Sequence, residues 1–413
     1  MYKYILIALI ICVQLSSITS CTEKNSQEKL SGSDDSSVPA HIRAIENVRV
    51  FDQKEQLTPV HDIRFSFEQT FGSTDSVLVM VGGSDRGLIV DRFDKVFIRD
   101  NKNHQIHVFD GQGEYVKGVG RPGRGPSEFL SIHRLDENDT LIYARDAMQY
   151  KLNVFSMESL EFVKSISTDP KAITGYEELT GYVLRGYYVR NDGTLLVFFE
   201  PSLNIEDPLE SREKYKTKYY LLNENWEIIS DLIYEHESYF GVNHSFQGRM
   251  HYGITFPFDR KTLTTISKTN NDIISAWTDE FLIKVYDEGG NYKRAIYYPY
   301  ENALIDREAL IERYDFGYEH AFFNTLKTME MPETWPALES IFVDDEDRMW
   351  VKTIVHDQSK YQYWVLDYSG ELLARFTWPR DKRLEYVRNG YVYTWENTEE
   401  ERVVNKYEII FES

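Results

Sequence analysis

Cysteine is scarce in this sequence, which has 2 among its 413 residues, Cys12 and Cys21. Cys12 lies within an N-terminal apolar run, residues 5–13, that has the layout of a secretory signal. Once such a signal is removed, Cys21 has no second thiol with which to pair, so a disulfide framework is excluded. An exported domain of this size must then be stabilised by its hydrophobic core.

Long hydrophobic runs are also missing. The run at residues 5–13 is shorter than the ~20 residues that a membrane-spanning helix needs. It ends before Ile18-Thr19-Ser20-Cys21, which resembles the lipobox of bacterial lipoproteins. We therefore expect residues 1–20 to be a lipoprotein signal peptide and Cys21 to carry the lipid anchor. The alternative is an ordinary cleavage signal that a cysteine happens to follow.

The stretch after the expected cleavage point is polar and serine-rich. Residues 21–40 contain almost no large apolar side chains, which is typical of a flexible tether. A lipidated Cys21 at the start of this tether predicts a location in the cell envelope. We expect the outer membrane, on either its periplasmic side or the cell surface, with the membrane itself as one partner.

Positive charge is in deficit, because 46 Lys and Arg face 67 Asp and Glu, giving a formal charge of −21. Removal of the signal takes away Lys3 and no acid, so the charge becomes −22. Nucleic acids and anionic headgroups attract basic patches. The balance thus argues against a nucleic-acid partner and leaves a protein, a small molecule or a glycan as the ligand.

Aromatic residues, by contrast, are plentiful at 14%, and they fall within an internal repeat of short strands and turns. An acidic or polar turn followed by a β-strand occurs six times, at residues 90–100, 135–146, 188–200, 268–277, 343–353 and 387–396. Two further strands joined by a turn follow the first five copies, at residues 107–119, 153–166, 219–232, 284–296 and 363–376. A unit of about 45 residues with this content is typical of a propeller blade.

The sixth copy is short and stops at residues 405–413. Residues 45–80 contain strand-like segments without a full unit of their own, so we expect them to complete the last blade. This predicts an all-β, six-bladed β-propeller over residues 41–413 that is closed by N- and C-terminal strands. A linear solenoid is the competing interpretation, and the truncated sixth copy argues against it.

One segment departs from the β pattern. Residues 303–328 have apolar side chains at helical spacing, with Asp306 placed to cap a helix. Pro332 and Pro336 then end the helical pattern. We expect a short helical insertion between the fourth and fifth blades, which either covers apolar surface or serves as a lid or docking element.

Two sequence motifs carry a resemblance to a known family. The segments at residues 120–129 (GRPGRGPSEF) and 331–351 resemble the six-bladed β-propeller lipoproteins of Bacteroides and its relatives, which are related to NHL-repeat proteins. The resemblance extends over nearly the whole chain, with Ser127 where the family usually has glycine. It implies a propeller in the cell envelope and no particular activity.

The 120–129 segment supplies the first candidate site. It lies where a propeller crosses from one blade to the next, so Arg121, Arg124 and Glu128 could ring the mouth of the central channel. Arginine recognises carboxylate or phosphate through its planar fork. The competing interpretation is structural, with the glycines shaping a tight crossover while Glu128 braces an arginine or backbone amides.

A second candidate is the polar-aromatic stretch at residues 243–253, which contains Arg249, His251 and His244. Histidines in such β segments are more often solvated or satisfied by a backbone group. The sequence shows no zinc-binding histidine spacing, no nucleophile elbow and no phosphate loop. The acidic turns, such as residues 344–347, lack the pattern of a calcium loop and are predicted to be hairpin turns.

No motif assigns a catalytic residue, a metal ligand or a cofactor. The leading hypothesis is therefore a ligand-binding or protein-interaction scaffold without catalytic activity. The alternative is a lactonase-like, lyase-like or glycan-active enzyme, in which side chains from several blades hold a metal such as calcium in the channel.

Overall fold

The computed structural model describes residues 38–73, 87–169, 176–202, 215–239, 241–315, 317, 320–398 and 401–412. The signal peptide and most of the tether predicted above lie outside these ranges. A single compact unit extends from Val38 to Ser413. Within the described ranges, no helix is both long enough and apolar enough to cross a membrane.

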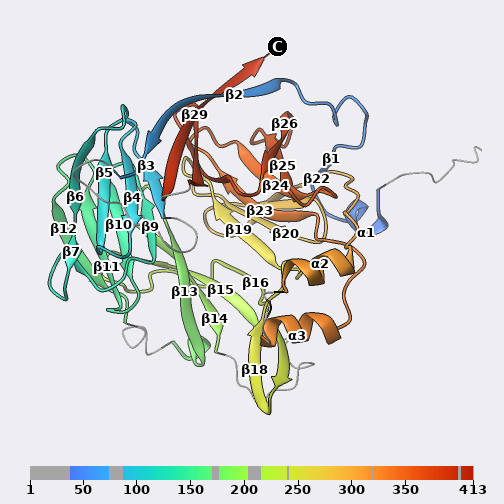
Figure 1. Ribbon diagram of the computed structural model, residues 1–413, viewed down its shortest axis with the longest axis horizontal. Helices are drawn as coiled ribbons and strands as arrows, with labels where there is room; N and C mark the ends of the chain where they lie inside the picture. Colours follow the sequence, from blue (N-terminus) through green and yellow to red (C-terminus); the bar gives the residue numbers. More distant parts are fainter. Residues whose placement is uncertain are drawn as a thin grey trace, which may run out of the picture. The chain divides into compact units, whose positions relative to one another are not determined.

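Six four-strand antiparallel blades make up this unit (Figure 1). Blade 1 contains β3 (Leu88–Val90), β4 (Val96–Asp100), β5 (Gln105–Phe109) and β6 (Tyr115–Val119). Blade 2 contains β9 (Arg134–Glu137), β10 (Leu141–Asp146), β11 (Lys151–Ser156) and β12 (Phe162–Ser167). Blade 3 contains β13 (Tyr182–Val189), β14 (Leu195–Pro201), β15 (Lys216–Leu222) and β16 (Tyr234–Glu237).

The second half of the chain repeats this order. Blade 4 contains β19 (Thr262–Ile266), β20 (Ile273–Trp277), β21 (Leu282–Tyr286) and β22 (Tyr292–Tyr297). Blade 5 contains β23 (Leu338–Val343), β24 (Met349–Ile354), β25 (Lys360–Leu366) and β26 (Leu372–Pro379). Blade 6 contains β27 (Arg383–Arg388), β28 (Tyr391–Asn397), β29 (Arg402–Glu412) and β2 (Asp62–Phe71).

The core lies between the blades. Separate apolar clusters join blades 1 and 2, 2 and 3, 3 and 4, 4 and 5, 5 and 6, and finally 6 and 1. The last of these clusters packs Phe71, Tyr393 and Trp395 of blade 6 against Phe109 of blade 1. Because the contacts return to the first blade, the propeller is closed, and the solenoid alternative is wrong.

The ends of the chain meet in blade 6. Strand β2 pairs antiparallel with β29 over a long register that runs from Asp62 opposite Glu412 to Phe71 opposite Val404. The predicted closure of the last blade by both chain ends is thus confirmed. Strand β2 is thus the outermost strand of the last blade, and its pairing covers the edge that β29 would otherwise expose.

Only part of residues 45–80 serves this closure. Strand β1 (Val48–Val50) instead pairs in parallel with β22, so it adds a fifth strand to blade 4. The preceding helix α1 (Ala40–Arg43) buries Ile42 against the same blade, which holds this segment there. The expectation that the segment at 45–50 belongs to blade 6 is therefore wrong, and residues 74–86 lie outside the described ranges.

The helical insertion between blades 4 and 5 consists of α2 (Arg307–Arg313) and α3 (Ala321–Thr328). The Asp306 carboxylate accepts a hydrogen bond from the backbone amide of Ala309, as expected for a helix cap. The apolar side chains of α2 and α3 pack with Phe256, Phe258 and Trp335. Figure 1 shows the insertion next to the hairpin of β17 (Val242–Phe246) and β18 (Arg249–Ile254), which α3 contacts.

Candidate site in the central channel

A cavity of about 240 Å³ lies where the innermost strands of all six blades converge. Its walls come from the ends of β3, β9, β13, β19, β23 and β27 and from the turns that follow those strands. Apolar residues of the strands form one part of the wall, namely Leu88, Ile89, Leu135, Ile266, Phe342, Val343 and Val387. Charged and polar residues of the strands and of the turns form the other part. This volume is slightly below the range of about 300–1,000 Å³ that is typical of ligand sites.

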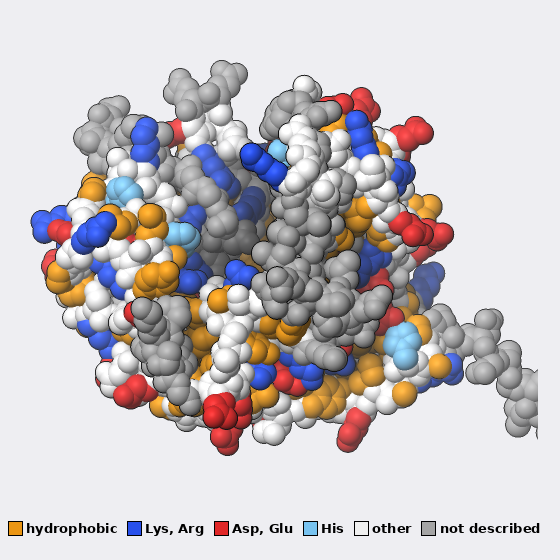
Figure 2. Space-filling view, turned by 90° about the horizontal axis from the view of Figure 1, so that it is seen from below, with side chains coloured by type: hydrophobic (Ala, Val, Ile, Leu, Met, Phe, Trp, Pro, Cys, Tyr) orange, Lys and Arg blue, Asp and Glu red, His pale blue; other side chains and the backbone are white. Residues whose placement is uncertain are grey.

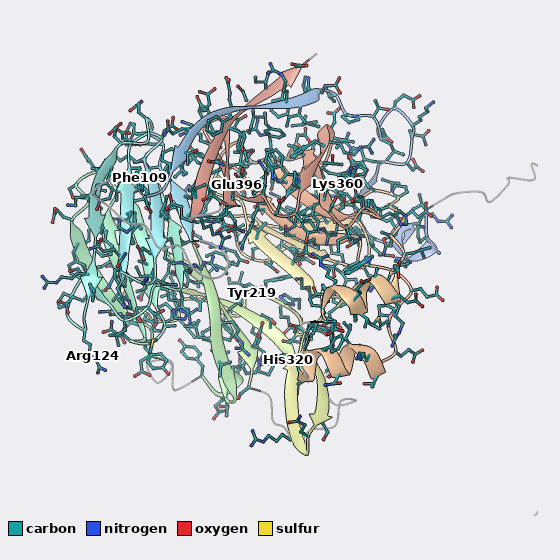
Figure 3. All side chains as sticks on the ribbon, viewed as in Figure 1. Phe109, Arg124, Tyr219, His320, Lys360 and Glu396 are labelled. Atoms are coloured by element: carbon teal, nitrogen blue, oxygen red, sulfur yellow. The ribbon has the colours of Figure 1, made fainter. Side chains whose placement is uncertain are left out.

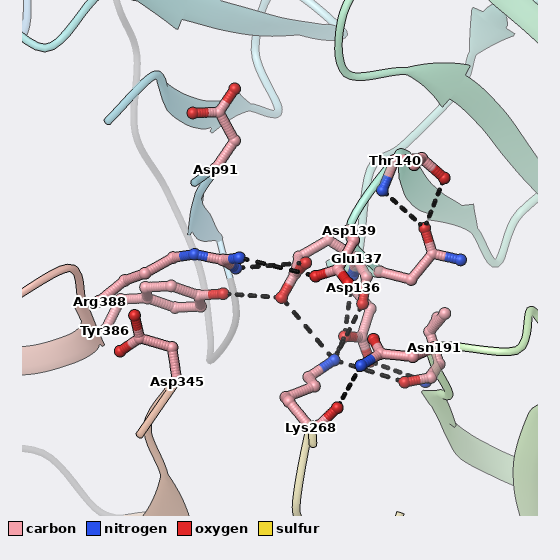
Figure 4. A network of polar contacts seen from close by, with 12 residues as sticks. Asp91, Asp136, Glu137, Asp139, Thr140, Asn191, Lys268, Asp345, Tyr386 and Arg388 are labelled. Carbon is pink, nitrogen blue, oxygen red and sulfur yellow. Dashed lines mark hydrogen bonds and ion pairs between the residues drawn. The ribbon is translucent and has the colours of Figure 1, made fainter. Parts of the chain in front are cut away.

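Blade 2 supplies the centre of a polar network in this cavity (Figure 4). Asp136 and Glu137, at the end of β9, are both almost fully buried. Lys268 extends from the β19–β20 turn of blade 4, and its Nζ lies 3.1 Å from Asp136 Oδ1. The same ammonium donates to the carbonyl of Glu137 at 2.9 Å and to that of Val189 in blade 3 at 3.4 Å. Lys268 therefore joins three blades across the channel.

Blade 6 contacts Glu137 from β27. The Tyr386 hydroxyl donates to Glu137 Oε1 at 2.9 Å, and Arg388 Nη1 lies 3.4 Å from Glu137 Oε2. Burial and the adjacent Glu137 raise the pKa of Tyr386 well above 10. Burial alone would lower the pKa of Arg388, but the neighbouring Tyr386 and Glu137 raise it overall. Tyr386 is thus a neutral donor and Arg388 a fixed cation at ordinary pH.

Blade 5 contributes Asp344 and Asp345 from the β23–β24 turn. Asp344 is buried and accepts hydrogen bonds from Arg348 Nε at 2.7 Å and from the Trp350 indole at 2.8 Å. Burial raises the pKa of Asp344 above 3.8. Asp345 accepts a hydrogen bond from the backbone amide of Asn389 in blade 6 at 3.0 Å. These contacts fix the turn where it faces the cavity.

The residues that line the cavity combine charged, polar and apolar side chains. Among the described residues that line the cavity, none is serine, cysteine or histidine. The buried carboxylates of blade 2 contact Lys268 and Arg388. In the described part of the chain, no group of three or more His, Cys, Asp or Glu side chains is placed to hold a metal ion. The walls offer hydrogen-bond donors and acceptors next to apolar surface, as in small-molecule sites.

The structure places the first predicted candidates elsewhere. Arg121, Arg124 and Glu128 do not line the cavity, and Figure 3 shows Arg124 at the periphery of the molecule. Glu128 accepts a hydrogen bond from Arg121 Nε at 2.9 Å and another from the Gly125 amide at 2.7 Å. These bonds lower the pKa of Glu128. The loop thus has the bracing contacts of the structural interpretation, and a ligand role for these residues stays a prediction.

Backbone geometry agrees with that interpretation. Ser127 has a φ of 61°, in the left-handed region that favours glycine. Gly123 has a φ of 147°, and a Cβ atom there would come within 2.1 Å of Glu128 Oε2. The loop between β7 (Arg121–Pro122) and β8 (Glu128–Phe129) therefore depends on glycine at position 123.

The second predicted candidates lie on the β17–β18 hairpin. Arg249 is exposed at the start of β18, and the backbone of His251 pairs with that of His244 across the hairpin. The side chains of both histidines lie outside the described set. Arg249 does not line the channel cavity. A role of Arg249 and His251 in ligand binding stays a prediction.

Sequence reasoning did not select the residues that line the cavity. Asp136, Glu137, Lys268, Asp345 and Arg388 all lie in or beside the polar turns that define the six repeats. These segments are hairpin turns, as predicted, but each also follows an innermost strand and so faces the channel. Their common position in the repeat is the signal that could have identified them.

One face of the molecule is hollowed near its centre, and Lys and Arg side chains gather around the hollow (Figure 2). The chain as a whole has a formal charge of −21. This face therefore carries basic side chains on a protein that is acidic overall.

Comparison with known proteins supports the fold. A family described as a 6-bladed beta-propeller, DUF5128, matches residues 74–230. A Bacteroides fragilis protein named for its expected export has a similar structure, with a TM-score of 0.50 and 14% identity over 89% of this chain and all of the other. A DUF4221-family member from Bacteroides vulgatus has a TM-score of 0.50 and 11% identity over 85% of this chain and 99% of the other.

More distant likenesses include a virginiamycin B lyase from Staphylococcus aureus, with a TM-score of 0.39 and 11% identity over 84% of this chain and all of the other. A likeness this remote says nothing about activity. Among curated proteins, none matches the sequence. The comparisons thus agree with the predicted six-bladed propeller and its resemblance to Bacteroides proteins, and they assign no reaction.

Proposed function

We propose that this six-bladed β-propeller, similar to exported propeller proteins of Bacteroides, is a lipid-anchored binding protein of the cell envelope. Its central cavity would hold a small molecule. The observation that supports this function best is the cavity itself, because all six blades contribute to one space. The contacts of Lys268, Tyr386 and Arg388 with blade 2 hold its polar wall in place before a ligand arrives. Such preorganisation lowers the cost of binding.

A cavity-filling substitution tests this function. Val343 is a partly exposed residue on the cavity wall, so Val343→Phe should occupy ligand space. Val163, on the outer strand β12, has 49% of its surface exposed, and Val163→Phe is the matched control. We expect small molecules found by a thermal-shift screen to stabilise the original protein and the Val163→Phe variant, but not Val343→Phe. A ligand at 100 times its Kd would add about 2.7 kcal/mol to the free energy of unfolding.

Two results would argue against a channel site. The first is a screen in which no sugar, carboxylate or amine raises the melting temperature. The second is a ligand whose stabilising effect is equal in Val343→Phe and in the control, because that ligand would bind elsewhere.

The lipid anchor is tested separately. We expect Cys21→Ala to move the protein from the membrane fraction to the soluble fraction, since Cys21 would be the lipidated residue. Cys12→Ala, a matched change within the proposed signal, should leave the protein in the membrane fraction. If Cys21→Ala stays membrane-bound, the anchor proposal is wrong.

The alternative function is a metal-dependent enzyme with calcium in the channel. Calcium titration of the same protein distinguishes it, because a metal that binds the folded state raises the melting temperature. A calcium-dependent rise that Val343→Phe abolishes would favour the enzyme and justify a screen of lactone and glycan substrates.

A further inference from the structure

The charges around the cavity do not balance. Six carboxylates line it, from Asp136, Glu137, Asp139, Asp344, Asp345 and Glu385. Five basic side chains contact these carboxylates within 4 Å, namely Lys268, Arg388, Arg134, Arg348 and Arg383. Among the described residues, the set is therefore short of one positive charge.

The shortfall is located at one residue. Asp136 and Glu137 contact Lys268, and Asp344 contacts Arg348. Asp139 contacts Arg388, and Glu385 contacts Arg383. Asp345 alone has no ion pair within the described ranges. Its Oδ2 accepts a backbone amide, while its Oδ1 is enclosed and has no hydrogen-bond partner in the described part of the chain. A buried carboxylate oxygen without a donor is costly.

Both described basic residues that line the cavity, Lys268 and Arg388, already contact other oxygen atoms of the protein. The Lys268 ammonium has three oxygen partners, at distances of 3.1, 2.9 and 3.4 Å. Arg388 lies between Glu137 and Asp139, at 3.4 and 3.9 Å. Figure 4 shows Asp345 next to Tyr386 and Arg388, with no dashed line reaching its carboxylate. Neither base forms an ion pair with Asp345, whose charge acts on Arg388 only at longer range. The partly exposed carboxylate can therefore accept a donor from outside the chain.

The size and walls of the cavity limit what that donor can be. At about 240 Å³, the space corresponds to about eight water molecules at ~30 Å³ each, which is far more than a bare ion needs. Ile89, Phe342 and Val387 provide apolar surface in the same cavity. An apolar wall opposite a carboxylate suits a molecule with a hydrocarbon body and a single charged end.

We propose that the channel ligand is a small organic ammonium ion, a primary amine on an apolar body, whose charge is neutralised by Asp345. The amine would approach the Oδ2 side of this carboxylate, beside the Asn389 amide. This inference rests on the proposed binding function and specifies the chemical class of the ligand. A monovalent inorganic cation shares the charge but would leave the apolar wall without contacts.

The test compares phenethylamine with its neutral analogue 2-phenylethanol and with potassium chloride, using calorimetry and thermal melting of the purified mature chain. We expect phenethylamine to bind at least tenfold more tightly than 2-phenylethanol. Asp345→Asn should weaken phenethylamine at least tenfold, because the amide keeps the shape but loses the charge. Asp381→Asn makes the same change of charge at an exposed turn outside the cavity and should have no effect.

Each other outcome overturns the inference in a distinct way. Equal binding of the amine and the alcohol, abolished by Val343→Phe, would leave the channel as a binding site but remove its cation preference. A response to potassium chloride that Asp345→Asn abolishes, with no response to phenethylamine, would identify an inorganic ion instead. Absence of amine binding by the original protein would also refute the proposal. If Asp345→Asn does not fold, the amine-to-alcohol ratio in the original protein decides.

Discussion

Replacing Lys268 by methionine is the most informative perturbation of the channel, because this side chain joins three blades. The substitution removes an ammonium whose contacts lie 3.1 Å away at Asp136 and 2.9 Å away at the Glu137 carbonyl. Hydrogen bonds to charged groups contribute about 1.5–3 kcal/mol each. Asp136 would keep its contact with Arg134 at 3.0 Å, so its charge is not left unpaired. We expect a loss of about 3 kcal/mol in the free energy of unfolding.

For a unit that extends from Val38 to Ser413, this loss lowers the Tm by about 4 °C, since the entropy of unfolding is about 2.1 cal/mol/K per residue. Calorimetry and urea denaturation measure it, with Lys102→Met, an exposed change of the same kind, as the control. A double-mutant cycle with Asp136→Asn should give a coupling energy above about 1 kcal/mol. A coupling below about 0.5 kcal/mol would refute the role of Lys268 as a link between blades.

Three further predictions concern other parts of the fold. Phe71→Ala, at the seam between blades 6 and 1, should lower the free energy of unfolding by about 3–5 kcal/mol, because Phe71 is 1% exposed and packs on Phe109. A loss below about 1 kcal/mol in urea denaturation would contradict a buried seam. Ser127→Gly should raise the Tm, since it relieves a left-handed φ worth about 1 kcal/mol; an unchanged or lower Tm would contradict it. Burial lowers the pKa of His236 below 6.5 in the folded state. The contribution of His236 to the free energy of unfolding should therefore be complete above pH 6.5 and be lost as the pH falls below 6.5. His236→Phe should make this loss of stability less steep, and an equally steep loss in the variant would show that other groups cause it.

The strand repeat made the fold predictable, because each blade carries its own turns and alternating apolar residues. The seam followed from the short sixth copy, and strand β2 indeed pairs with β29. The pairing of β1 with blade 4 could not be foreseen, because three residues of strand pattern do not specify a partner. That choice depends on burial of Ile42 against blade 4, which is a tertiary effect.

The site was harder to predict for a different reason. Lys268 and Asp136 are more than a hundred residues apart, and only the circular arrangement of blades brings them together. Arg121 and Glu128 form a conspicuous motif, yet their contacts are local to one loop. Short motifs report local structure, whereas a channel site is assembled from single residues of separate blades.

Hydrogen–deuterium exchange, with the strongest ligand found in the screen, tests the central claim most directly. If the ligand occupies the channel, amides in the turns at residues 136–140, 267–269, 344–347 and 388–390 should exchange more slowly in its presence. Protection confined to residues 120–129 or to the β17–β18 hairpin, with the channel turns unchanged, would place the ligand at the sites first suggested by the sequence and contradict the account.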